Sequence, residues 1–199
     1  VYNFNREDAD LTKSLVHPYV PRFPRHVSYD LVLFGSWRRK GVYVGEKQIA
    51  SPGSYPVAGF NFAPMYNLNY KLRFGVSLDG VYDGSANVYT EDALVEYDAG
   101  SGSSRRKFLV PGIQNQLALG LSGRAEYVMP FFTIGVGLGT NVLGRGNLRG
   151  LYQVFALKIN VTRSSFLHIG YNLQDFQTPN YLMLGLGFRF NNKYPKVRH

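Results

Sequence analysis

The 199-residue sequence contains no cysteine, which excludes a disulfide framework, a thiolate metal site and a cysteine nucleophile. It also lacks any apolar run near the roughly 18 residues that a membrane-spanning helix requires. A helical membrane protein is therefore excluded. A membrane barrel is not, because its strands are short and alternate apolar with polar residues.

Aromatic residues and glycine are abundant, with 15 Tyr, 14 Phe and 22 Gly. This mixture is typical of strands, tight turns and close backbone packing rather than helices. The chain does not begin with Met, and residues 1–5 show no secretory signal. We therefore expect a processed, mature chain.

The first 26 residues differ from the rest. They carry three prolines, Pro18, Pro21 and Pro24, and show no alternation. Proline lacks a backbone donor, so this segment cannot form a central strand. We interpret residues 1–26 as an extension that precedes the folded domain.

From Val27 onward, apolar and polar residues alternate with a period of two, which indicates β-strands. The pattern is clearest over 71–83, where Leu72, Phe74 and Val76 alternate with charged or polar residues. Eight such segments are predicted: 27–37, 57–66, 71–83, 113–127, 131–143, 150–161, 166–174 and 181–190. Strands of this length, tilted by about 40°, cross an apolar band about 25 Å tall. The predicted fold is all-β, an eight-stranded antiparallel transmembrane β-barrel.

Short connections alternate with long ones along the chain. The short ones are 67–70, 128–130 and 162–165, and the long ones are 38–56, 84–112, 144–149 and 175–180. In outer-membrane barrels the short turns face the periplasm. We therefore expect a bacterial outer-membrane protein with both termini periplasmic: an extension over 1–26, a barrel over 27–190 and a tail over 191–199.

A soluble lipocalin-like carrier would also show eight alternating strands, but with its apolar face inside. Aromatic residues near strand ends on the apolar face favour a membrane barrel, since interfaces hold such girdles: Trp37, Tyr66, Tyr82 and Tyr127. The polar face carries four basic residues (Arg73, Arg124, Lys158 and Arg189) and four acidic ones (Asp30, Asp79, Asp83 and Glu126). We expect these charges to pair and to fill the lumen.

The C-terminal half carries a family resemblance. The stretch Phe166-Leu167-His168-Ile169-Gly170-Tyr171-Asn172, followed by Thr178-Pro179-Asn180, resembles the lipid A deacylase (acyloxyacyl hydrolase-like) family of outer-membrane barrels. The resemblance implies a Ser nucleophile two residues after a His, and an acid on the next strand. A deacylase uses the His as base and the acid to orient it.

Two of the three residues that this pattern requires, the serine and the acid, have no counterpart in this sequence. Matching His168 to the family's His places Gly170 at the serine position, whereas aligning the Pro-Asn loop places Asn172 there. No Asp or Glu follows Asp175, so the acid is missing in either register. We therefore interpret His168, the single weak catalytic candidate, as a hydrogen-bonded lumen residue, and we lean against an enzyme.

Basic residues gather in the predicted outer loops, where lipopolysaccharide presents phosphates. The candidate lipopolysaccharide contacts are Arg38, Arg39, Lys40, Arg105, Arg106, Lys107, Arg145 and Arg149. Acidic loop residues dilute this field, so a merely solvated surface remains an alternative. We expect no metal, no cofactor and no nucleic-acid partner.

The leading functional hypothesis is a non-catalytic barrel that acts as a structural or accessory subunit of an outer-membrane assembly. The extension motivates it, because an extended Pro-rich segment suits recognition by other outer-membrane or periplasmic proteins. Its candidate partner-binding residues are Tyr19, Val20, Arg22, Phe23 and Arg25. The alternative is a lipid A deacylase with an unusual active site.

Overall fold

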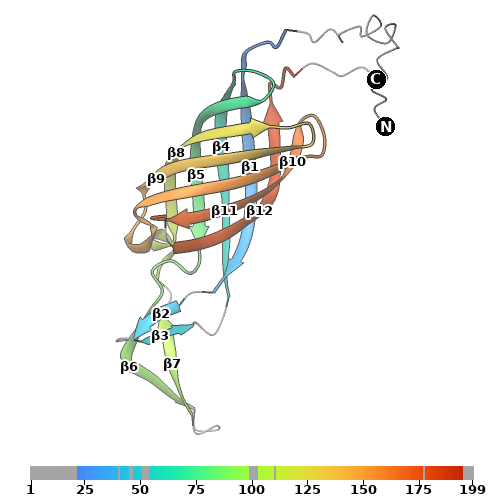
Figure 1. Ribbon diagram of the computed structural model, residues 1–199. Coiled ribbons are helices and arrows are strands. Elements are labelled where there is room, and N and C mark those ends of the chain that lie inside the picture. Colours follow the sequence, from blue (N-terminus) through green and yellow to red (C-terminus); the bar gives the residue numbers. More distant parts are fainter. Residues whose placement is uncertain are drawn as a thin grey trace, which may run out of the picture.

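A computed structural model describes residues 22–39, 41–44, 47–50, 54–98, 103–109, 111–176 and 178–194. In this part of the chain, eight antiparallel strands form a closed barrel, and β1 pairs with β12 to close it (Figure 1). The barrel strands are β1 (His26–Arg38), β4 (Tyr55–Asn67), β5 (Leu72–Asp83), β8 (Leu117–Val128), β9 (Phe132–Leu143), β10 (Leu151–Asn160), β11 (Ser165–Gln174) and β12 (Thr178–Phe190). The predicted fold is confirmed.

The structure differs from the sequence prediction mainly in the long connections. Two of them contain hairpins that were not predicted, β2 (Gly41–Val44) with β3 (Lys47–Ala50) and β6 (Tyr89–Asp98) with β7 (Ser103–Leu109). The fourth predicted strand began too early, because a 3₁₀ turn, η1 (Ile113–Asn115), precedes β8. A second such turn, η2 (Gly146–Leu148), lies between β9 and β10.

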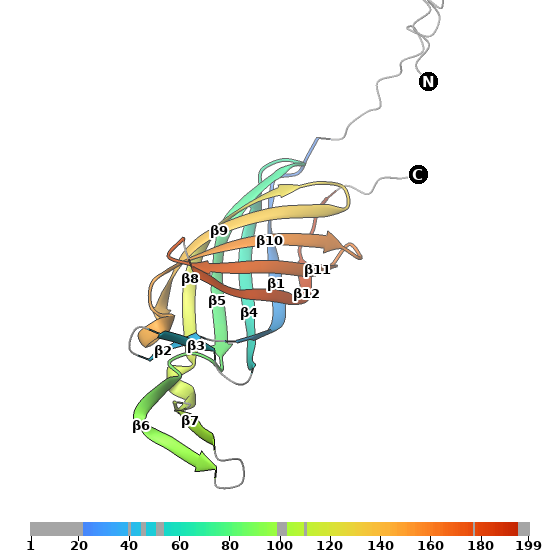
Figure 2. The ribbon, with the colours of Figure 1, turned by 60° about the horizontal axis from the view of Figure 1, so that its bottom comes forward.

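The two ends of the barrel differ in the connections they carry. The hairpins extend from one end, and the three short turns lie at the other (Figure 2). Strand β1 begins and β12 ends at the short-turn end, so residues 22–25 and 191–194 lie there (Figure 1). We call these the hairpin end and the short-turn end.

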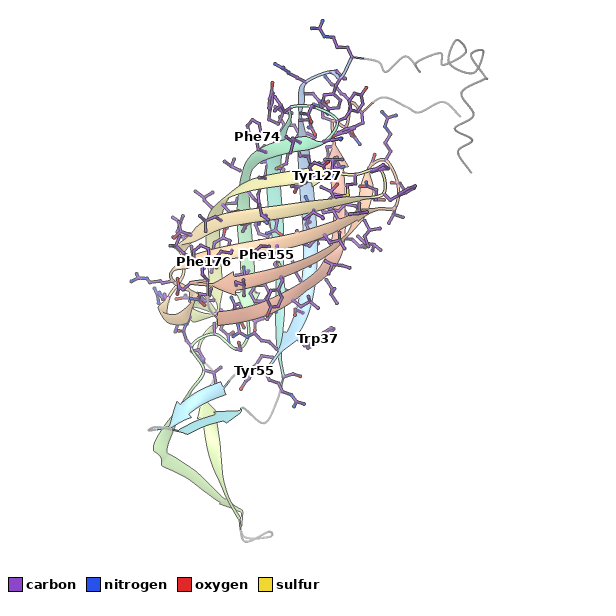
Figure 3. The ribbon with its side chains drawn as sticks, viewed as in Figure 1. Trp37, Tyr55, Phe74, Tyr127, Phe155 and Phe176 are labelled. Carbon is purple, nitrogen blue, oxygen red and sulfur yellow. The ribbon has the colours of Figure 1, made fainter. Side chains whose placement is uncertain are left out.

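The polarity of the barrel is the reverse of that of a soluble protein. Large apolar side chains point outward and are exposed, such as Val76 at 62% and Leu184 at 52%, and Phe155 lies among them in Figure 3. The buried interior instead holds charged residues, including Arg73 and Asp30. No charged side chain points outward from the described barrel strands between their ends. An apolar outer wall is stable in lipid but not in water, because exposed apolar side chains are unfavourable in water. The lipocalin-like alternative is therefore excluded.

No helix among the described residues is long and apolar enough to cross a membrane.

Three lumen-facing glycines on β9 make room for large polar side chains. A Cβ atom on Gly137 would lie 2.7 Å from Cδ of Arg124, and one on Gly139 would lie 2.6 Å from the ring of Tyr152. Gly135 faces Glu126 in the same way, at 3.1 Å. The glycine repeat of this strand therefore serves lumen packing, because Cβ atoms there would crowd the side chains of Arg124, Tyr152 and Glu126.

Candidate functional site

Five buried charged side chains fill the lumen toward the short-turn end, and we call them the lumen ion-pair cluster. Asp30 accepts from Nε of Arg189 (2.9 Å), Nζ of Lys158 (2.8 Å) and Nη2 of Arg73 (3.1 Å). Glu126 accepts from Nε of Arg73 (2.6 Å) and Nζ of Lys158 (2.7 Å). The predicted pairing of lumen charges is confirmed for these residues.

The cluster contains three cations, Arg73, Lys158 and Arg189, and two carboxylates, Asp30 and Glu126. The ring of Phe166 lies 5.0 Å from Nζ of Lys158 and 5.2 Å from Cζ of Arg189. An aromatic face attracts cations and so offsets part of the imbalance. The cluster keeps one positive charge in excess.

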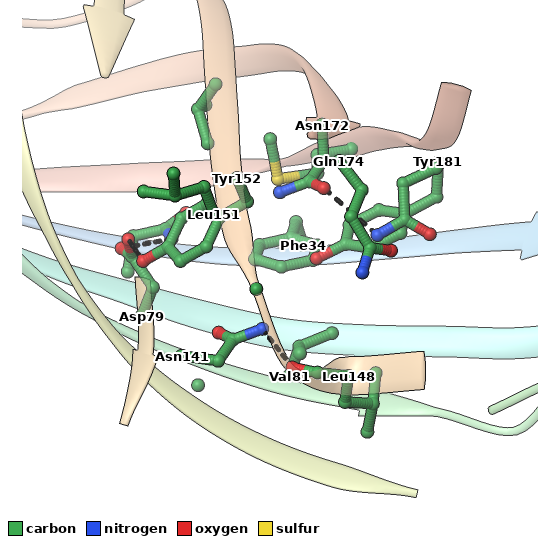
Figure 4. A pocket seen from close by; sticks show the side chains of 16 residues that line it. Phe34, Asp79, Val81, Asn141, Leu148, Leu151, Tyr152, Asn172, Gln174 and Tyr181 are labelled. Atoms are coloured by element: carbon green, nitrogen blue, oxygen red, sulfur yellow. Dashed lines mark hydrogen bonds between the residues drawn. The ribbon is translucent and has the colours of Figure 1, made fainter. Parts of the chain in front are cut away.

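A second group lies closer to the hairpin end, around Asp79, and Figure 4 shows Asp79 beside Tyr152. Asp79 accepts from Nη2 of Arg124 at 2.9 Å and from Oη of Tyr152 at 2.6 Å. Further donors to it, each at 2.6 Å, are Ser77, Ser122 and Asn61. With this many donors the carboxylate is held in place as a structural acceptor.

Arg38 and Asp83 form a third ion pair at the hairpin end, with Nη1 2.9 Å from Oδ2. Arg38 was predicted to lie in an outer loop, but it is the last residue of β1 and also donates to Asn180. Strand β1 extends one residue further than predicted, and this position has the parity of the lumen face. Its side chain is 19% exposed, so the structure assigns Arg38 to lumen packing.

Side chains pack the middle of the barrel closely. The interior cavity seen in Figure 4 has a volume of about 30 Å³ and is lined by residues such as Phe34, Tyr152 and Tyr181. That volume holds about two water molecules. The described barrel therefore has no open pore, as expected for eight strands.

His168 lies on the lumen face of β11, 3% exposed, opposite Lys158 and Gly185 in the strand register. Neither Nδ1 nor Nε2 has a hydrogen-bond partner among the described residues. The prediction of a hydrogen-bonded lumen histidine was correct on its location and wrong on its bonding. The residues opposite His168 on the neighbouring strands are Lys158 and Gly185. Neither has a side-chain acceptor for an imidazole N–H.

A side chain at Gly170, the position that the resemblance assigns to the nucleophile, would require Met183 and His168 to move. A Cβ atom there would lie 2.6 Å from Cε of Met183 and 2.7 Å from Nε2 of His168. In the other register, Asn172 accepts a hydrogen bond from Nδ2 of Asn180 at 3.0 Å. In both registers the residue at the serine position faces the packed lumen. No Ser, Asp or Glu of the described chain forms a hydrogen bond with His168.

The candidate lipopolysaccharide contacts fall into three groups. Arg39, Arg145 and Arg149 are exposed at the hairpin end. Lys40 lies outside the described residues, as do the side chains of Arg105, Arg106 and Lys107, which belong to β7. The backbone register places Arg105 opposite Glu96, and Arg38 pairs inward as described above.

The described part of the predicted extension packs against the barrel. The ring of Phe23 lies 4.8 Å from that of Tyr70, 5.1 Å from that of Tyr194 and 5.8 Å from that of His26. These four residues, which we call the aromatic plug, lie together at the short-turn end. The sequence alone gives no signal for this contact, because only the closed barrel brings His26, Tyr70 and Tyr194 together.

The partner-binding candidates of the extension differ in how accessible they are. Arg22 and Arg25 are exposed, and Tyr19 and Val20 lie outside the described residues. Phe23 is half-buried in the aromatic plug. Among the described partner-binding candidates, the two arginines are thus the ones that are fully exposed to a partner.

Residues 27–192 match the sequence model of a family described as acyloxyacyl hydrolase, C-terminal domain. No curated protein matches the chain. Two solved structures of Ail, the attachment invasion locus protein of Yersinia pestis, are similar to it. The one in complex with the heparin analogue sucrose octasulfate is 14% identical, covers 84% of this chain and 100% of that chain, and has a TM-score of 0.41. The other is 16% identical with the same coverage and a TM-score of 0.43.

Proposed function

The chain belongs to the acyloxyacyl hydrolase family, and we propose that this member keeps the family's outer-membrane barrel without its hydrolytic site. The barrel acts as a structural or accessory subunit of an outer-membrane protein assembly. Both of its termini lie in the periplasm, and its hairpin end contacts lipopolysaccharide.

The observation that carries this proposal is the pair His168 and Gly170. An activated serine must lie within about 2.6–3.2 Å of its base. Gly170 has no such group, and a Cβ atom there would already collide with Met183 and the imidazole. His168 also faces the packed lumen, whereas an acyl ester of a membrane lipid lies outside the wall.

The architecture supports the proposed orientation. Outer-membrane barrels have short periplasmic turns and longer extracellular loops. Here all three short turns lie at the end where β1 begins and β12 ends. Arg39, Arg145 and Arg149 are exposed at the opposite end, where they can pair with the phosphates of lipopolysaccharide.

The filled lumen supports an accessory role. Buried charged and polar side chains fill the lumen around an interior cavity of only about 30 Å³, so the wall and the two ends are the surfaces available for function. Arg22 and Arg25 are exposed at the short-turn end, where the extension joins the barrel. Such a segment is suited to recognition by another protein.

Family membership favours a second candidate, a lipid A deacylase with an unusual active site. This activity would require a nucleophile and base other than Gly170 and His168. The two candidates differ in one measurable product, since a deacylase removes an acyl chain from lipid A.

Mass spectrometry of lipid A from cells with and without the gene tests the choice. We expect identical acylation in the wild type, the deletion strain and a strain carrying His168→Ala. In parallel, extraction in mild detergent is expected to recover the barrel together with other outer-membrane proteins. Loss of one acyl chain that depends on the gene would establish the deacylase, and a barrel that purifies alone would remove the accessory role.

A further inference from the structure

A cavity of about 530 Å³ opens at the short-turn end of the barrel, and we call it the mouth cavity. The three short turns and the segment after β12 line it, with Tyr70, Lys71, Arg163, Arg189, Asn192 and Tyr194 among the lining residues. Its volume lies within the range of small-ligand sites, about 300–1,000 Å³.

The charged residues that line the mouth cavity are all basic. Lys71 and Arg163 are exposed on two turns, and Arg189 reaches it from the lumen ion-pair cluster. No Asp or Glu is among the described lining residues, and neither Lys71 nor Arg163 forms an ion pair with the described chain. The cluster beneath adds its own excess of one positive charge.

Two hydrogen bonds hold the segment after β12 at the cavity, and two buried polar atoms beside it have no partner among the described residues. Nη2 of Arg163 donates to the backbone carbonyl of Tyr194 at 2.5 Å, and Nδ2 of Asn192 donates to that of Arg163 at 2.9 Å. Oη of Tyr194 and Nη1 of Arg73 are buried and lack a hydrogen-bond partner among the described residues. Burial raises the pKa of Tyr194, so its hydroxyl remains a donor near neutral pH.

We propose that the mouth cavity binds a carboxylate-bearing, acidic peptide segment of a partner protein, with the exposed Lys71 and Arg163 facing its side-chain carboxylates and Arg189 adding positive charge beneath them. This inference rests on the proposed accessory role and gives that role a location. Amide and hydroxyl groups of Asn160, Thr162 and Asn192 line the same cavity and suit a peptide backbone.

The position of the cavity favours a peptide over a lipid headgroup. It lies over the mouth of the barrel, enclosed by turns from three hairpins, rather than on the apolar wall. A segment that approaches along the barrel axis meets Arg22 and Arg25 at the same end. The described residues of this end, 22–25, 68–71, 129–131, 161–164 and 191–194, contain no acidic residue, so an acidic partner meets no repulsion from them.

The test uses the full-length barrel in phosphatidylcholine nanodiscs and a fluorescein-labelled peptide, acetyl-Gly-Glu-Leu-Glu-Gly-Glu-amide. Fluorescence polarisation measures its affinity, with the Gln version of the peptide as ligand control. We expect Lys71→Gln with Arg163→Gln to weaken binding about tenfold or more, because each removes a cation that faces a carboxylate. Arg145→Gln with Arg149→Gln removes the same charge at the hairpin end, and Lys193→Gln removes one at the short-turn end outside the cavity lining; neither should change the affinity.

Three outcomes overturn the proposal: equal binding of the Glu and Gln peptides, full affinity in the Lys71/Arg163 variant, or equal losses in the controls. A fourth is displacement of the peptide by phosphatidylglycerol nanodiscs in a manner that depends on Lys71 and Arg163, which would assign the cavity to lipid phosphate. The lipid A measurement stands apart from all four. A deacylase result with intact peptide binding therefore rejects the proposed function alone, and co-purifying proteins with no peptide binding reject the mouth cavity alone.

Discussion

Gly170 and His168 lie two residues apart on the lumen face of β11, and a Cβ atom on Gly170 would lie 2.7 Å from Nε2 of the imidazole. The spacing matches the serine and histidine of the family resemblance. The surroundings do not, since Met183 occupies the space that a serine side chain needs.

Gly170→Ala should therefore destabilise the barrel. Overpacking in a filled interior costs about 1–3 kcal/mol. Gly123→Ala is the matched control, because its Cβ would lie 4.0 Å from the nearest atom, the carbonyl oxygen of Leu138. Urea unfolding in detergent, followed by the heat-modifiable shift on gels, measures both. The double variant Gly170→Ala/Met183→Ala should recover part of the loss, and equal stability of the two glycine variants would contradict the packing argument.

The charge balance of the lumen ion-pair cluster gives a second prediction. Asp30→Asn leaves three cations facing Glu126 and should cost about 3–5 kcal/mol, as expected when a buried pair loses one partner. Lys158→Met instead leaves two cations and two carboxylates, and its loss should be clearly smaller. The midpoints of urea unfolding compare them. A Lys158→Met barrel as unstable as the Asp30→Asn barrel would show that charge balance does not govern this cluster.

Arg38 and Arg39 are neighbours in sequence with different surroundings. Arg38 pairs with Asp83, so Arg38→Gln should lower the stability of the barrel and leave binding to lipopolysaccharide micelles unchanged. The triple variant Arg39→Gln, Arg145→Gln and Arg149→Gln should do the reverse, because these exposed side chains face the proposed outer surface. Tryptophan fluorescence of Trp37 during lipopolysaccharide titration reports binding. A triple variant with wild-type affinity would remove these residues as contacts.

Deletion of the extension and mutation of the aromatic plug should have different effects. Removing residues 1–22 takes away no barrel strand and keeps Phe23, so the barrel should fold and retain its heat-modifiable shift. The same deletion should reduce co-purification with partner proteins. Phe23→Ala should instead lower stability by about 1 kcal/mol, since aromatic pairs contribute about 0.5–1.5 kcal/mol beyond their burial. Full recovery of every partner by the truncated barrel would show that residues 1–22 have no part in recognition.

The sequence by itself determined the number of barrel strands and which residues share a face, and its aromatic residues near strand ends favoured the reversed polarity. Side chains alternate with a strict period of two in a strand, so Leu72, Phe74 and Val76 could be assigned to one face and Arg73 to the other without coordinates. The sequence also showed that the residue two positions after His168 is glycine, which removes the expected nucleophile. These inferences are local, and each depends on residues within one segment.

Only the tertiary structure decided which groups meet. Asp30 and Arg189 are 159 residues apart and bond because β1 closes the barrel against β12. The partner of Asp83 is Arg38 because β1 extends to that residue, and Asn180 bonds Asn172 beside the register shift between β11 and β12. The mouth cavity likewise joins three turns and the segment after β12. Strand register and barrel closure are cooperative properties of the whole sheet, so no single segment of the sequence encodes these contacts.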